Sequence, residues 1–245
     1  MNYSQDIAPA PPRRVRTVPI PGVRPVWTYV ILAVTGLVFL GQLILGDPFT
    51  FYGLKINQNI LAGEYWRLIT PIFFHAGWLH FFFNMYALYI VGRQIERPLG
   101  YARFLMIYFF SGIAGGIASF LFNPSYSLGA SGAIFGLIGA LAVFLYRHTR
   151  LLGPVGRSML SNVVAIIVLN LLISFTPGID LWGHLGGLVT GSALAWLIGP
   201  RWRLELDPLT GNPYAVDLNP MSRRLPLAFF LILACFLASL WLLVR

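Results

Sequence analysis

The stretch GASGAIFGLIGALAVFLY, residues 129–146, has one strongly polar side chain, Ser131, and ends in front of Arg147. From Ser131 onward it holds 16 residues, roughly 24 Å of helix at 1.5 Å per residue. That is shorter than the hydrocarbon core of a bilayer, about 30 Å. If Arg147 fixes the inner end, the helix begins several Å below the outer surface. Non-helical backbone at that depth requires surrounding protein or a wet cavity. The sequence therefore predicts a water-accessible depression at Ser131.

Six further apolar segments flank this one, at 26–45, 79–91, 104–122, 162–175, 181–199 and 227–244. The segment 79–91 is also short for a span. Of all 245 residues, 57% are hydrophobic and 10% are charged, against about 25% charged in soluble domains. We therefore predict an all-α polytopic membrane protein: a six-helix bundle plus a seventh, C-terminal transmembrane helix.

The arginines predict how the chain is threaded through the membrane. With a cytoplasmic N-terminus and seven spans, 14 of the 17 basic residues lie inside, as the positive-inside rule requires. The same placement argues against a nucleic-acid-binding face. The expected parts are a Pro/Arg-rich cytoplasmic tail (1–25), the six-helix core (26–199) with a membrane-associated outer loop (46–78), a turn-rich cytoplasmic linker (200–226) and the seventh helix (227–245).

Four polar side chains are expected at similar depth near the outer ends of three segments: Ser131, His184, His80 and Asn84. Polar groups inside a membrane are costly and usually functional. A serine hydroxyl becomes nucleophilic beside a base, which makes Ser131 and His184 a candidate pair. Each also has a simpler interpretation, Ser131 as a helix cap and His184 as a packed bundle histidine.

The spacing of residues along the predicted helices supports a close approach of these polar side chains. Glycines recur every fourth residue at 132 and 136 and at 183, 187 and 191, and such small-residue faces let membrane helices approach closely. His80 and Asn84 are four apart on one helix face, where they can donate to a carbonyl oxygen or simply bond between helices. Phe135, four after Ser131, can stack on His184 or be ordinary core.

Across residues 63–199 the sequence resembles the rhomboid family of intramembrane serine proteases. The matching stretches are Glu64-Tyr65-Trp66-Arg67, Phe74-His75, His80-Phe81-Phe82-Phe83-Asn84, Gly129-Ala130-Ser131-Gly132-Ala133-Ile134-Phe135-Gly136 and Gly183-His184-Leu185-Gly186-Gly187 with Gly191. One departure is Gly183, where relatives often carry alanine.

The resemblance implies a serine endopeptidase with Ser131 as nucleophile and His184 as general base, a dyad without a third acid. It implies an oxyanion pocket from His80, Asn84 and the Ser131 backbone N–H, supported by Gly129 and Phe135. It also implies a structural loop containing Trp66, Arg67 and a hydrogen-bonded His75, and a structural acid at Glu96. No metal or cofactor is needed. The implied substrates are single-pass transmembrane proteins, cut near the outer boundary of the bilayer.

Competing interpretations remain. An inactive relative acting as a membrane-helix chaperone or retention factor would characteristically lack the serine or histidine. A transporter or proton channel usually needs polar groups deeper in the membrane. The default location is a bacterial plasma (inner) membrane with the site opening outward, and a mitochondrial membrane is the alternative. Asp180, four residues before His184, is expected to precede the helix and turn toward water rather than complete a triad.

Overall fold

The computed structural model describes residues 20–222 and Pro226; the predicted seventh helix and most of the predicted N-terminal tail lie outside these residues. In chain order the helices are α1 (Val26–Leu45), α2 (Asp47–Gly53), α3 (Asn57–Leu61), α4 (Trp78–Leu99), α5 (Tyr101–Phe122), α6 (Ser131–Arg147), α7 (Thr149–Ile173) and α8 (Leu181–Ile198), with 3-10 turns at Tyr65–Leu68 and Thr70–Phe73. The strands β1 (Trp202–Leu206) and β2 (Pro213–Asp217) pair as an antiparallel hairpin.

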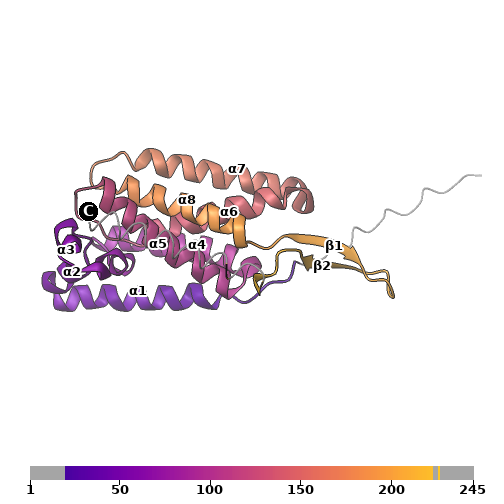
Figure 1. Ribbon diagram of the computed structural model, residues 1–245, viewed down its shortest axis with the longest axis horizontal. Coiled ribbons are helices and arrows are strands. Elements are labelled where there is room, and N and C mark those ends of the chain that lie inside the picture. Colours follow the sequence, from indigo (N-terminus) through magenta and orange to yellow (C-terminus); the bar gives the residue numbers. More distant parts are fainter. Residues whose placement is uncertain (1–19, 223–225, 227–245) are drawn as a thin grey trace, which may run out of the picture.

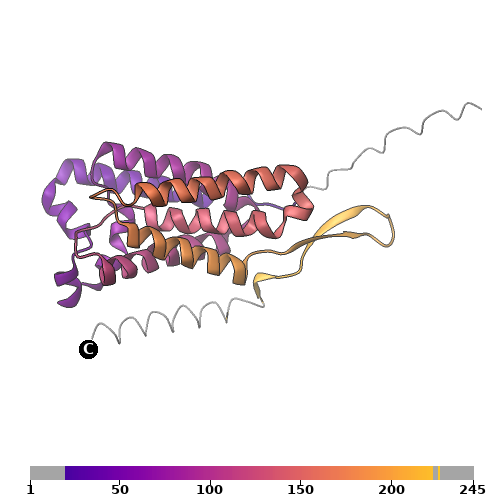
Figure 2. The ribbon, with the colours of Figure 1, turned by 90° about the horizontal axis from the view of Figure 1, so that it is seen from above.

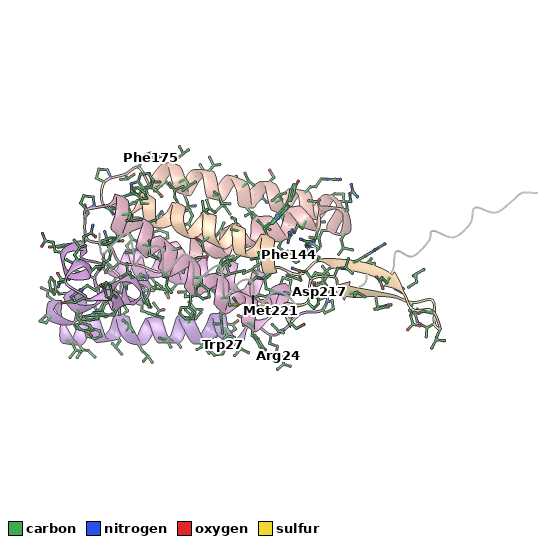
Figure 3. All side chains as sticks on the ribbon, viewed as in Figure 1. Arg24, Trp27, Phe144, Phe175, Asp217 and Met221 are labelled. Atoms are coloured by element: carbon green, nitrogen blue, oxygen red, sulfur yellow. The ribbon has the colours of Figure 1, made fainter. Side chains whose placement is uncertain are left out.

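The six long helices lie side by side along the long axis of the molecule (Figure 1). The short helices α2 and α3 cluster at one end, and the β1–β2 hairpin projects from the other, as the view from above also shows (Figure 2). In Figure 3, Phe144 and Asp217 lie toward the hairpin and Phe175 lies at the opposite end. We call the end that carries β1 and β2 the hairpin end. We call the opposite end the Ser131 end, because α6 begins there at Ser131.

Several helices have the length and composition of membrane spans, as predicted for a multi-pass membrane protein. Among the described helices, α1, α5, α7 and α8 are long and apolar enough to cross a bilayer, and α6 is a shorter apolar helix. The all-α bundle class is confirmed, and the hairpin within 200–226 is a small addition to it. Helix α6 has 17 residues and is therefore short, as expected; its start below the membrane surface stays a prediction.

Two helices extend beyond their apolar segments. The prediction that 79–91 is a short span is wrong, because α4 has 22 residues and continues to Leu99. Its charged end stays helical because Glu96, fully buried, accepts hydrogen bonds from the backbone N–H groups of Trp27 and Thr28, 2.8 Å each, at the start of α1. Similarly, α7 begins at Thr149 rather than 162, with a kink at Gly153.

Helix α6 occupies the centre of the bundle and packs against α4, α5, α7 and α8. Its crossing with α8 is closest where glycines face each other. A Cβ added to Gly187 would collide with the carbonyl oxygen of Gly132, and one added to Gly191 would collide with that of Gly136. The predicted close approach of these two helices is therefore confirmed, and its physical basis is the absence of side chains along both faces.

The loop between α1 and α4 is held by buried cations. Arg67, 2% exposed, donates to the carbonyl oxygens of Phe51 and Leu54 at 2.6 and 2.8 Å. Lys55, 1% exposed, donates to the carbonyl oxygens of Asn123 and Ser125 at 2.6 and 2.9 Å. Because the second pair lies in the segment that leads to Ser131, Lys55 fixes the approach to α6.

Candidate active site

Ser131 is the first residue of α6, and a glycine turn places it there. Gly129 has φ of +130° and its N–H donates to the carbonyl oxygen of Pro71 at 2.8 Å. A residue with a Cβ is strained at such a φ. The first backbone N–H groups of a helix have no partner within the helix, so the Ser131 end of α6 presents hydrogen-bond donors and a positive dipole end.

His184 lies in the first turn of α8 and faces Ser131 across the glycine crossing. Its Nε2 is 2.9 Å from the Oγ of Ser131, within hydrogen-bond distance. The ring of Phe135 stacks on the imidazole, with ring centroids 4.3 Å apart and planes 16° apart. His184 is 9% exposed and Phe135 is 5% exposed. The structure thus brings together all three residues from α6 and α8, with the imidazole orientation limited by packing.

A third polar residue, which the sequence analysis did not identify, contacts the other side of the imidazole. The Oγ of Ser174, at the C-terminal cap of α7, is 2.7 Å from the Nδ1 of His184. The same hydroxyl donates to the carbonyl oxygen of Asn170 at 2.6 Å. One feature of the sequence could have indicated Ser174: it is the only serine of the apolar segment 162–175 and lies near its end, as the other polar candidates lie near the ends of theirs.

His80 and Asn84 occupy one face of α4 beside the serine. The ring of His80 lies against Gly129, where an added Cβ would come within 2.7 Å of its Cε1 and 2.8 Å of its Nε2. The Nδ1 of His80 accepts from the Ala76 N–H at 3.4 Å. Asn84, 6% exposed, donates one amide hydrogen to the His80 carbonyl oxygen at 2.9 Å and keeps a second hydrogen for another acceptor. Gly129 therefore contributes room for His80 rather than a free N–H.

The carboxylate of Asp180 does not bond the His184 imidazole; these two residues are joined through the backbone, where the His184 N–H donates to the Asp180 carbonyl oxygen at 3.1 Å. As expected, Asp180 precedes α8, and its Oδ1 accepts from the Gly183 N–H at 3.0 Å. The expectation that its carboxylate turns toward water is wrong, because Oδ2 accepts from the Ser127 hydroxyl at 2.6 Å and the residue is half-buried. Burial raises the pKa of Asp180, but the hydrogen bonds from Ser127 and the Gly183 N–H oppose this effect, and the pKa lies below its usual value.

The loop residues implied by the resemblance have defined places. Arg67 bonds the loop backbone, as described above, and Trp66 stacks on Tyr52 with ring centroids 5.6 Å apart. The backbone of buried His75 exchanges hydrogen bonds with the Gln42 side chain, 2.9 Å at its N–H and 3.1 Å at its carbonyl oxygen. These contacts hold the outer loop to α1.

A cavity of about 40 Å³ adjoins the serine, and one water needs about 10–15 Å³ on the same measure. Its lining includes Ser131, Gly129, Lys55, Ser127 and Asp180. The cavity is thus polar and large enough for water beside the candidate nucleophile. Within residues 20–222, no group of three His, Cys, Asp or Glu side chains is arranged to hold a metal ion.

A half-buried serine at the start of α6 thus lies within hydrogen-bond distance of a buried histidine in the first turn of α8, an arrangement that hydrolases use. The Rhomboid domain family model matches residues 62–201, more than half of the chain. The chain belongs to the rhomboid family.

Several named proteins of this family are similar to the chain, and one of them is named as a rhomboid protease. The chain is 43% identical over 183 residues to Rhomboid protease GluP of Bacillus subtilis (strain 168), covering 72% of this chain and 35% of GluP. It is 39% identical over 143 residues to Putative rhomboid protease YdcA of the same organism, covering 58% and 71%. It is also 39% identical over 146 residues to RHOMBOID-like protein 6, mitochondrial, of Arabidopsis thaliana, covering 59% and 47%. The chain spans about a third of the length of GluP.

Proposed function

We propose that this protein is an intramembrane serine endopeptidase that uses Ser131 as nucleophile and His184 as general base. The observation that carries the proposal is the 2.9 Å distance from the Ser131 Oγ to the His184 Nε2 at the start of α6. A serine hydroxyl beside an oriented imidazole is the arrangement that activates the nucleophile in acyl transfer. The family relationship supports proteolysis as the activity.

In the proposed reaction the Ser131 oxygen attacks the scissile carbonyl carbon while its proton passes to Nε2 of His184. The imidazolium then protonates the leaving amine, which releases the first product and leaves an acyl-enzyme. A water molecule then attacks the ester, again with His184 as base, and regenerates the serine. Stacking on Phe135 keeps the ring plane fixed through both steps.

The developing oxyanion needs donors aimed at it. We assign this role to the backbone N–H of Ser131, the free amide hydrogen of Asn84 and the His80 ring. The last two residues share one face of α4. The Asn84 side chain is held by its 2.9 Å bond to the His80 carbonyl oxygen, and the Nδ1 of the His80 ring accepts from the Ala76 N–H at 3.4 Å. The positive end of the α6 dipole adds to their effect.

The proposed substrates are single-pass transmembrane proteins, cut within or near the outer part of their span. The short length of α6, 17 residues, supports this proposal, because a helix shorter than a full span can begin below the outer surface of the bilayer. The biased arginine distribution supports a cytoplasmic N-terminus, an outward-opening site and a bacterial plasma membrane.

The test is labelling by a serine-directed fluorophosphonate, followed by cleavage of a single-pass substrate in liposomes. Wild type is expected to react in both assays and Ser131→Ala in neither. Ser161→Ala is the control, because Ser161 is exposed on α7. Cleavage by purified, folded Ser131→Ala would overturn the mechanism. Substrate binding without labelling or cleavage by wild type would favour the alternative, an inactive membrane-helix chaperone or retention factor.

A further inference from the structure

The contacts of His184 reveal which of its ring nitrogens carries the proton. A serine hydroxyl has one hydrogen to donate. The oxygen of Ser174 lies 2.6 Å from the Asn170 carbonyl oxygen. Because a carbonyl oxygen has no hydrogen, Ser174 must donate its hydrogen there. Toward the His184 Nδ1, 2.7 Å away, Ser174 can therefore only accept.

We propose that Ser174 is a positioning residue that holds the neutral imidazole of His184 in the tautomer with the proton on Nδ1. In that tautomer Nε2 has a free lone pair, and it is the atom 2.9 Å from the Ser131 Oγ. The proton chain then runs from Ser131 to Nε2, while Nδ1–H donates to Ser174 and Ser174 donates to Asn170. This inference deepens the proposed function, on which its kinetic consequence rests.

Burial makes this hydrogen bond consequential. Ser174 is 3% exposed and His184 is 9% exposed, so water does not readily replace a lost partner. When Nε2 takes the serine proton, the imidazolium keeps its Nδ1–H bonded to Ser174. Hydrogen bonds to charged groups are about twice as strong as neutral ones. Ser174 thus does in this chain what an aspartate does in a triad, without adding a charge to the membrane interior.

The test combines kinetics with a tautomer measurement. Ser174→Ala and Ser174→Cys are expected to lower kcat about 10- to 100-fold, because a hydrogen bond to the imidazolium is lost and Ser174 is too buried for water to replace it. Little change in KM is expected. Cys has the shape of Ser but bonds weakly. Ser174→Thr, which keeps the hydroxyl, is expected to retain more activity than either. Ser161→Ala is again the surface control.

The decisive measurement is ¹⁵N NMR of histidine-labelled protein, with the His184 signal assigned from a His184→Asn sample. We expect the proton on Nδ1 in wild type and a shift toward the Nε2 tautomer in Ser174→Ala. A wild-type proton on Nε2, or an unchanged tautomer and kcat in Ser174→Ala, would overturn the inference. The NMR result stands even if no proteolysis is found, so failure of the proposed function is distinguishable.

A second, independent observation concerns a groove of about 470 Å³ at the hairpin end, between α4 and α7 and floored by α6. Its walls are largely apolar, including Ile90, Leu141, Leu145, Leu152 and Met159, and Tyr89, Arg93, Gln94 and Arg97 line its α4 side.

The two arginines of the groove lack acidic partners. Within the described residues neither forms an ion pair. The guanidinium of Arg93 lies 4.6 Å from the ring centroid of Tyr89, and its Nε is buried without a hydrogen-bond partner. A guanidinium is suited to bidentate bonding of phosphate. The groove thus combines one buried, unsatisfied donor on Arg93 and the exposed cation of Arg97 with apolar walls beside them.

We infer that this groove binds one anionic phospholipid, with its phosphate on Arg93 and Arg97 and an acyl chain along α6. Basic pockets between membrane helices on the cytoplasmic side bind anionic headgroups. Two guanidinium groups beside apolar walls favour a molecule with an anionic head and an apolar chain over a protein helix.

The test is native mass spectrometry of the full chain with phosphatidylglycerol and phosphatidylcholine of identical acyl chains. We expect selective retention of phosphatidylglycerol, and a loss of about 30-fold in its affinity for Arg93→Gln/Arg97→Gln, from about 1 kcal/mol per arginine. The control Arg150→Gln/Arg157→Gln removes two exposed cations of α7 that do not line the groove. An equal loss in the control, equal retention of phosphatidylcholine, or equal competition by soluble glycerol phosphate would overturn the site.

Discussion

Asn84 tests the proposed oxyanion pocket at the residue scale. One of its amide hydrogens is used by the His80 carbonyl oxygen at 2.9 Å, and the other is available to substrate. We expect Asn84→Ala to reduce kcat about 10²–10³-fold, the usual cost of one oxyanion donor, with serine labelling reduced but not abolished. Asn84→Asp, of equal shape but without donors when ionised, is expected to be at least as impaired. Unchanged turnover in both folded variants would assign Asn84 to packing alone.

Asp180 tests whether the site is a dyad. Its carboxylate bonds Ser127 and the Gly183 N–H, and Ser174 occupies the Nδ1 position that a triad acid would need. We expect Asp180→Asn to change kcat/KM less than about tenfold, or about 1.4 kcal/mol, and to change stability little, because Asn caps a helix about as well as Asp. The measurement pairs steady-state cleavage with thermal unfolding. A loss near 10⁴, typical of a triad acid, at unchanged stability would refute the dyad.

Single residues differ in how well sequence alone locates them. Ser131 and His184 stand out because each is polar in an apolar segment and follows or sits among regularly spaced glycines. Ser174 could not be assigned, since its role depends on where α7 ends relative to α8, which no local pattern fixes. Gly129 was placed in the site correctly as a neighbour, but its N–H bonds Pro71, a loop contact invisible in sequence.

At the element scale, the α6–α8 crossing sets the separation of the two proposed catalytic side chains. Gly191 faces the Gly136 backbone so closely that a Cβ has no space. We expect Gly191→Val to force the helices apart, to abolish serine labelling and to lower the melting temperature, because core overpacking costs about 1–3 kcal/mol. Gly36→Ala is the matched control, since an added Cβ there meets nothing within 4 Å. Wild-type labelling by Gly191→Val would show that the close crossing is dispensable.

Helix boundaries were predictable where hydrophobicity marks them and not elsewhere. The start of α6 and the whole of α1 match their apolar segments. The C-terminal end of α4 does not match its apolar segment, because Glu96 is buried and caps the start of α1 instead of lying exposed at a charged helix end. Glu96 lies 69 positions after Trp27 and 68 positions after Thr28. Local periodicity in the sequence cannot predict a contact over that separation.

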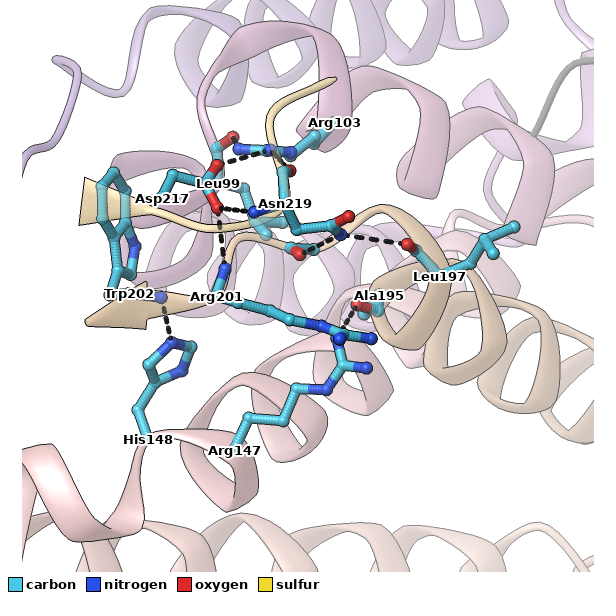
Figure 4. Close-up of polar contacts among 11 residues, drawn as sticks. Leu99, Arg103, Arg147, His148, Ala195, Leu197, Arg201, Trp202, Asp217 and Asn219 are labelled. Carbon is cyan, nitrogen blue, oxygen red and sulfur yellow. Dashed lines mark hydrogen bonds and ion pairs between the residues drawn. The ribbon is translucent and has the colours of Figure 1, made fainter. Parts of the chain in front are cut away.

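For the whole molecule, the hairpin is anchored to the bundle by a polar cluster (Figure 4). Arg103 of α5 donates to Asp217 at 2.7 Å and to the Asn219 carbonyl oxygen at 2.6 Å. Asn219 in turn donates to the carbonyl oxygens of Leu197 and Gly199 at the end of α8. The bundle class could be predicted from composition, whereas the hairpin could not, because its position depends on these contacts with two separate helices, α5 and α8.

His148 links this cluster to α6 and makes the hairpin sensitive to acid. Its Nδ1 lies 2.7 Å from the Phe144 carbonyl oxygen, so the proton resides there, and its Nε2 accepts from the Trp202 N–H at 3.1 Å. Burial and Arg147 lower the pKa of His148, opposed by the Phe144 carbonyl and Asp217. Burial raises the pKa of Asp217, but bonds from Arg201, Asn219 and Arg103 outweigh this, so that carboxylate stays ionised in mild acid.

The sign of the pH effect follows from these shifts. The folded state holds His148 neutral, whereas the unfolded chain protonates it near its ordinary pKa of about 6.5. The stabilisation is therefore present above pH of about 6.5 and is lost as pH falls toward the lower folded pKa. A second proton on Nε2 would also face the Trp202 N–H and break that bond.

We expect faster amide exchange in β1 at pH 5.5 than at 7.5, after correction for intrinsic rates. His148→Ala is expected to exchange fast at both values. The Ser131 end is remote from this cluster, so serine labelling of His148→Ala is expected to stay within about twofold of wild type at pH 7.5. Equal, slow exchange of wild-type β1 at both pH values would show that His148 does not control the docking of the hairpin.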